Sequence, residues 1–155
     1  MTRRAFLSGL GAVVAGFSLP HWLGGGDASA QGQTFSRILV DTRPLEARGA
    51  GGQAAIIRPR LQASLQRELA GRIGRRGPVL TVRVHTILLS SFIGNDRGGV
   101  PSDYLEGEVI VGREGFPMLV TQSSDSGGTW YLPDNEARRL RAIADSFASW
   151  IRRRV

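Results

Sequence analysis

The chain has 155 residues and a formal net charge of +7, and all 20 of its basic residues are arginine. Apolar residues make up 41% of it, which suffices for one small core and excludes a fibre or a disordered tail. The absence of cysteine excludes a disulfide scaffold, a cysteine-ligated zinc or iron–sulfur site, a thiol nucleophile and a lipid-modified cysteine anchor.

The first 30 residues have the pattern of an export signal. Arg3 and Arg4 precede an apolar run over residues 9–19, which is too short to span a bilayer as a helix, since a span needs roughly 20 residues. The small residues Ala28 and Ala30 suit a cleavage site that leaves Gln31 as the new N-terminus.

The arginine pair, followed by Phe6 and Leu7, resembles the motif of a twin-arginine translocation signal. The resemblance covers residues 2–30 and implies that residues 31–155 are exported to the periplasm as one folded domain. Two alternatives stay open: an ordinary secretory signal, and a signal retained as an N-terminal anchor.

The first elements of the exported part are a strand and a helix. Residues 37–41 are β-branched and apolar, which predicts a strand. Residues 45–53 contain three glycines and predict a loop. A helix follows over residues 54–73, and Pro59 favours a regular start near Arg58. Its predicted apolar stripe is Ile57, Leu61, Leu65, Leu69 and Ile73.

Three strands are predicted next, over residues 78–92, 103–112 and 116–122, with a turn at 113–115. In the first of them, alternation places Leu80, Val82, Val84 and Leu88 inward, and Thr81, Arg83 and His85 outward. In the second, Tyr104, Glu106, Glu108 and Ile110 are predicted to face outward. Residues 123–128 predict a flexible loop.

The last helix has the clearest amphipathic pattern of the chain. Asp134 is its expected N-cap, and Arg152 to Arg154 lie at its end, where the helix dipole favours cations. Both Phe147 and Trp150 are predicted to be buried. The full stripe is Ala137, Leu140, Ile143, Ala144, Phe147, Trp150 and Ile151.

These elements predict an α+β fold with the order β-α-β-β-β-α. The helix-linked strands should be parallel and the last three strands should form an antiparallel meander. Each helix has a single apolar stripe, so the expected architecture is a two-layer sandwich: a four-stranded mixed sheet with two helices on one face.

Candidate catalytic groups are few. His85 is the only histidine after residue 30, and its position in a strand indicates an ordinary surface residue rather than part of a catalytic triad. Glu106 and Glu108 alternate on one strand face. They could serve a small hydrolase as an acid–base pair, but pairing with Arg83 across strands is the favoured interpretation.

The sequence predicts no cofactor and no metal site. Asp96, Asp103 and Asp125 lack the spacing of a calcium loop, and the glycines before the first helix lack the Lys-Ser/Thr of a phosphate-binding loop. The arginines favour anionic partners. Because an export signal makes nucleic acid an improbable partner, the expected anions are envelope lipids and acidic polysaccharides. A solvated arginine-rich surface is the alternative.

By element order, size and export signal, residues 37–151 resemble small periplasmic envelope-assembly accessory proteins, including the lipopolysaccharide-assembly and transporter-auxiliary lipoproteins. The lipobox cysteine of those families is absent. The resemblance implies a non-enzymatic periplasmic binding or accessory domain without a stable transmembrane segment. The candidate binding surface is the sheet face opposite the helices, with Ile87, Leu89 and Phe92 as an apolar extension: Arg83, His85, Tyr104, Glu106 and Ile110.

Overall fold

The computed structural model describes residues 33–90, 101–127 and 133–155. Its elements follow the chain order β1 (Arg37–Asp41), α1 (Arg43–Ala47), α2 (Gly51–Glu68), β2 (Val79–Leu88), β3 (Ser102–Val111), β4 (Glu114–Ser123) and α3 (Asn135–Arg154). Short 3₁₀ turns follow α2 at Ala70–Arg72 and β4 at Ser124–Gly127. The predicted signal residues Arg3, Arg4, Ala30 and Gln31 lie outside the described residues, as does Phe92.

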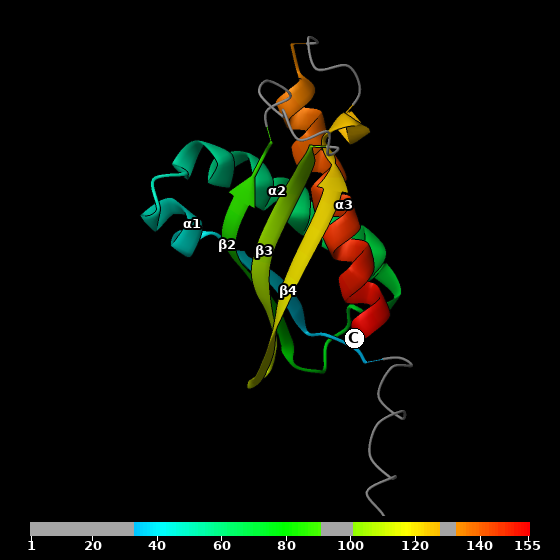
Figure 1. Ribbon diagram of the computed structural model, residues 1–155. Coiled ribbons are helices and arrows are strands. Elements are labelled where there is room, and N and C mark those ends of the chain that lie inside the picture. Colours follow the sequence, from blue (N-terminus) through cyan, green and yellow to red (C-terminus); the bar gives the residue numbers. More distant parts are fainter. Residues whose placement is uncertain (1–32, 91–100, 128–132) are drawn as a thin grey trace, which may run out of the picture.

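The predicted α+β architecture is confirmed. One sheet has the strand order β1-β2-β3-β4, in which β1 and β2 are parallel and the other neighbours are antiparallel. Helices α2 and α3 pack together and against the same face of the sheet (Figure 1). Within the part of the chain that the structure describes, no helix is long and apolar enough to cross a membrane.

The core lies between this sheet face and the two long helices. Alternate strand residues such as Leu80, Val82, Leu105 and Val109 are fully buried, as the period of two predicts. Phe147 of α3 packs over Gly107 of β3: a Cβ at Gly107 would lie 2.6 Å from the Arg83 carbonyl oxygen and 3.4 Å from the Phe147 ring. The glycine therefore lets backbone and ring approach closely.

The prediction of a loop over residues 45–53 is wrong. This region contains the end of α1 and the first turn of α2, which begins at Gly51 rather than near Arg58 and holds Pro59 in its interior. Ala54 and Ile57 are buried, so packing of this first part of α2 outweighs the roughly 1 kcal/mol that each glycine costs in a helix. Helix α2 also ends earlier, at Glu68, and Ile73 is exposed instead of completing the stripe.

Smaller corrections concern turns and caps. The β3–β4 turn consists of Gly112 and Arg113, with Gly112 at φ 64°, because Val111 already pairs with Glu114. Asp134 is the N-cap residue of α3, as predicted, but its side chain makes no capping hydrogen bond and pairs with Arg138 instead. The predicted loop after β4 is partly a 3₁₀ turn in which Ser124 is buried.

Candidate functional site

The candidate surface is the sheet face opposite α2 and α3. Strand pairing aligns its residues in rows across the sheet, since directly opposite residues point to the same face. One row is Asp41, Arg83, Glu108 and Pro117, the next is Thr86, Glu106 and Leu119, and the last is Leu88, Tyr104 and Thr121. Ile110 lies opposite Thr81. Of the predicted residues, Arg83, Tyr104, Glu106 and Ile110 thus share this face.

The first row is a ladder of alternating charges. The Arg83 guanidinium lies between two carboxylates, with Nη1 3.0 Å from Glu108 Oε2 and Nε 3.6 Å from Asp41 Oδ2. The predicted cross-strand pairing of Arg83 is therefore confirmed for Glu108. Asp41 was not among the predicted site residues, although its place at the end of β1 opposite Arg83 follows from the parallel pairing.

Asp41 is also held by the first turn of α1. Arg43 donates from Nε to Asp41 Oδ1 at 2.8 Å, from Nη2 to Oδ2 at 2.8 Å and from its backbone N–H to Oδ1 at 3.1 Å. These hydrogen bonds, with the charges of Arg43 and Arg83, hold the pKa of Asp41 well below its usual range against the opposing effect of burial. The same contact raises the pKa of Arg43.

His85 stands apart from this row. The β2–β3 pairing passes from Val84 opposite Gly107 directly to Thr86 opposite Glu106, so His85 is the extra residue of a β-bulge. Up to Val84 the even-numbered residues of β2 face the core, whereas after the bulge the odd-numbered ones do. Ile87 is consequently buried in the core and Leu88 is exposed.

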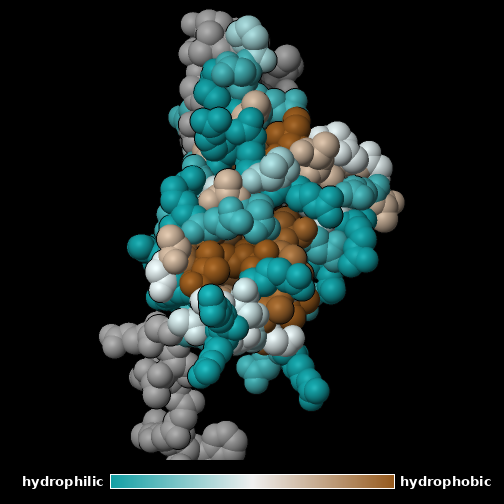
Figure 2. All heavy atoms as spheres, turned by 180° about the vertical axis from the view of Figure 1, so that it is seen from behind, coloured by the Kyte–Doolittle hydropathy of each residue, from teal (hydrophilic) through white to brown (hydrophobic). Residues whose placement is uncertain are grey.

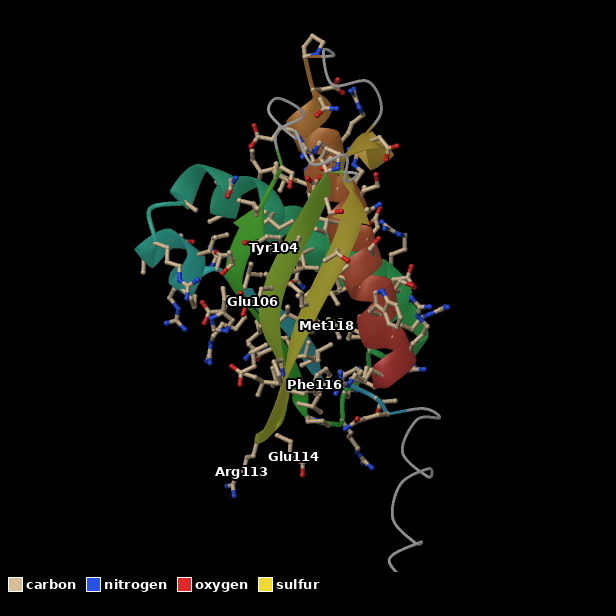
Figure 3. The ribbon with its side chains drawn as sticks, in the orientation of Figure 1. Tyr104, Glu106, Arg113, Glu114, Phe116 and Met118 are labelled. Atoms are coloured by element: carbon tan, nitrogen blue, oxygen red, sulfur yellow. The ribbon has the colours of Figure 1, made fainter. Side chains whose placement is uncertain are left out.

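The apolar extension predicted for this face is therefore wrong for Ile87 and Leu89, while Phe92 lies outside the described residues. Ile87 is buried and Leu89 packs against the core, so neither contributes to the surface as expected. Leu88 and Leu119 take that role, with 46% and 62% of their surface exposed, and both lie in the rows that contain Tyr104 and Glu106. Figure 3 shows Tyr104 and Glu106 along β3.

The two carboxylates of β3 have different surroundings. Glu108 is engaged by Arg83, whereas Glu106 is exposed between Thr86 and Leu119. Among the described residues, no group of three or more histidine or acidic side chains is placed to hold a metal ion.

A second surface feature, which the sequence analysis missed, lies beside β4. Trp150, predicted to be buried, is 52% exposed, and Arg153 stacks on its ring at 4.0 Å. Together with β4, these side chains line a groove of about 400 Å³. The 3.6-residue period places Trp150 at the margin of the α3 stripe, and Ala148 takes a buried position instead.

Apolar side chains also reach the surface on the far side of the molecule. In the view from behind, hydrophobic side chains gather in the middle of the face and hydrophilic ones surround them (Figure 2). Leu39 of the edge strand β1 is also exposed, and it lies opposite Thr81 on the outer sheet face. Exposure alone therefore does not single out a binding surface, and the pattern of neighbouring charges has to be considered with it.

The arginines of α3 do not form one anion-binding surface. Arg139 is 8% exposed and bound to Asp103, and Arg152 pairs with Glu68 at 3.3 Å. Arg153 and Arg154 instead stack on Trp150 and Phe116. These four arginines therefore make different contacts and do not form the single cationic surface expected from the sequence.

Comparison with known proteins gives a limited result. The chain matches no protein-family model and no curated protein. It is similar to a crystal structure described as a minor lipoprotein from Acinetobacter baumannii, with 13% sequence identity and a TM-score of 0.46. The likeness covers 77% of this chain and 91% of the other.

Proposed function

We propose that the protein is an exported, non-enzymatic binding or envelope-assembly accessory domain of the periplasm, and that the sheet face opposite α2 and α3 contacts its partner. The observation that supports this proposal most directly is the composition of that face. Exposed Leu88 and Leu119 flank Tyr104 and Glu106 beside the fixed charge ladder of Arg83. Apolar area next to ordered charges is typical of protein–protein interfaces.

The twin-arginine motif and the small residues before Gln31 support export to the periplasm as part of this proposal. An envelope protein is the proposed partner, and an anionic envelope lipid or polysaccharide is the alternative. A nucleic-acid partner is not proposed, because the export signal would remove the protein from the cytoplasm.

Site-specific photo-crosslinking tests the proposed surface. p-Benzoylphenylalanine at Tyr104 should crosslink the full chain to an envelope component in cells, whereas the same residue at Arg141, which is exposed on α3, should not. Leu88→Glu should lower the crosslinking yield from Tyr104, because it places a charge in the apolar part of the face. Equal yields from Tyr104 and Arg141, or none from either, would contradict the proposal.

The rival function is a small periplasmic hydrolase that uses Glu106 and Glu108, or His85. Purified protein should show no turnover of glycan, ester or phosphoester substrates. A turnover that Glu106→Gln or Glu108→Gln abolishes would overturn the non-enzymatic proposal, because an amide keeps the shape of the carboxylate but cannot transfer a proton.

A further inference from the structure

The groove beside β4 has an apolar floor and a cationic wall. It has a volume of about 400 Å³ and lies between β4, from Pro117 to Val120, and the last turns of α3, at Trp150, Arg153 and Arg154. Met118 and Val120 are buried at its base, and Trp150 is 52% exposed at its side. Figure 3 shows Phe116 and Met118 on the strand that borders the groove.

The backbone of β4 is unpaired along this groove. The sheet order ends at β4, so among the described residues no strand pairs with its outer edge. Val111 and Glu114 flank a two-residue turn and form a hydrogen-bonded pair, which directs the N–H and C=O groups of Leu119 and Thr121 away from β3. Pro117 lies in the same alternation as Leu119 and Thr121, so its missing N–H would point away from β3 and removes no hydrogen bond between the two strands.

The cations at the groove lack carboxylate neighbours. Arg153 stacks on Trp150 at 4.0 Å and Arg154 on Phe116 at 4.2 Å. In residues 33–90, 101–127 and 133–155, no carboxylate lies within ion-pair distance of either guanidinium, whereas Arg152 nearby has Glu68 at 3.3 Å. The groove therefore presents two positive charges that are held in place by aromatic rings and are not neutralised.

We infer that this groove binds an extended acidic segment of a partner protein, which adds to the sheet as a strand beside β4. The segment's backbone would bond to Leu119 and Thr121, its groove-facing carboxylates would reach Arg153 and Arg154, and apolar side chains on its other face would lie beside Leu119. The groove shares Leu119 with the outer sheet face, but its two arginines and the β4 edge lie outside that face, so this inference does not rest on the proposed function.

Two other occupants fit the observations less well. A second copy of this chain carries the same formal charge of +7, so pairing of two β4 edges would bring like charges together. An anionic lipid would satisfy the arginines but would leave the N–H groups of Leu119 and Thr121 without a backbone partner.

Fluorescence anisotropy with two synthetic peptides tests the inference. Both are labelled octapeptides with blocked ends: one alternates glutamate with valine and the other alternates lysine with valine. The glutamate peptide should bind the purified protein at least about tenfold more tightly, since a tenfold change in Kd is a modest free-energy difference for two close charge pairs.

Matched variants distinguish the contribution of the β4 backbone edge to peptide binding from that of the two arginines. Thr121→Pro should weaken binding of the glutamate peptide by about tenfold or more because it removes an edge N–H, whereas Thr121→Val keeps that N–H and should leave binding unchanged. Arg153→Gln together with Arg154→Gln should remove the preference for glutamate over lysine. Arg113→Gln with Arg141→Gln changes the net charge equally and should preserve that preference.

Three results would overturn the inference. The first is no binding of the glutamate peptide, or equal binding of the two peptides. The second is binding to Thr121→Pro as tight as to Thr121→Val. The third is that the peptide does not bind, while the protein binds phosphatidylglycerol vesicles or forms a concentration-dependent dimer. In that case the vesicle binding or the dimer would be lost in the Arg153 and Arg154 double variant.

Discussion

Arg139 and Asp103 form an ion pair inside the protein, with side chains 9% and 1% exposed. Arg139 Nε donates to Asp103 Oδ2 at 2.8 Å and its Nη2 donates to the Ser90 carbonyl oxygen at 2.7 Å. Asp103 Oδ1 also accepts from the Ser124 hydroxyl at 2.8 Å and from the Ser90 N–H at 3.0 Å. This cluster joins α3 to the start of β3 and to the chain that follows β2 and β4.

Removal of Arg139 should be strongly destabilising. Arg139→Met would leave the Asp103 carboxylate buried without its cation, which typically costs about 3–5 kcal/mol of unfolding free energy. Urea unfolding followed by circular dichroism measures the change. Arg141→Met, an exposed substitution on the same helix, should stay within about 0.5 kcal/mol of the unchanged protein. Similar effects of the two substitutions would show that the buried pair is not needed.

The acid stability of the protein should depend on Asp41. Its lowered pKa means that its ionised form is favoured in the folded state, so its contribution is complete above the unfolded pKa near 3.8 and is lost as the pH falls below that value. In Arg43→Ala the pKa of Asp41 should rise toward 3.8, because Arg43 supplies the main hydrogen bonds.

An NMR titration of the Asp41 carboxyl carbon measures this directly. The stability of Arg43→Ala should also fall less steeply on acidification than that of the unchanged protein, since less of the difference in pKa between folded and unfolded states remains. An unchanged Asp41 titration in Arg43→Ala would contradict the prediction.

Phe147 and Trp150 should differ sharply in their effect on stability. Phe147 is fully buried over Gly107, and truncation of a buried phenylalanine to alanine typically costs about 3–5 kcal/mol. Trp150 is half exposed, so Trp150→Ala should cost much less. Thermal melts of the two variants compare them, and an equal loss would mean that the Trp150 ring is more buried in solution.

Export should depend on the arginine pair in the signal. Replacement of Arg3 and Arg4 together by lysine should stop export by the twin-arginine route, and the exported protein should begin at Gln31. Fractionation and mass spectrometry of the periplasmic protein check both expectations. Processing that continues in the double-lysine variant would instead indicate the general secretory route.

The strand alternation predicted most of the fold and of the outer sheet face. It placed Arg83, Tyr104, Glu106 and Ile110 together because a period of two depends only on local geometry and burial. It failed beyond Val84, where one unpaired residue exchanges the two faces. A bulge depends on how the partner strand aligns, which the local pattern does not contain.

The other differences arise from tertiary packing. Helix α2 begins at Gly51 because Ala54 and Ile57 have a core to pack against, and glycine content alone predicts a loop there. In sequence, Arg139 is not distinguished from the other arginines of α3, such as exposed Arg141, and only its position against Asp103 explains its burial. The groove beside β4 likewise requires two elements that are distant in the chain.

The bulge at His85 has a consequence for changes of chain length. Val84 and Thr86 face neighbouring residues of β3, Gly107 and Glu106, so deletion of His85 would leave the same residues opposite each other on both sides of the gap. A deletion elsewhere in β2 would turn every following side chain to the opposite face. The strand therefore contains one position where the protein can lose a residue without exposing its core.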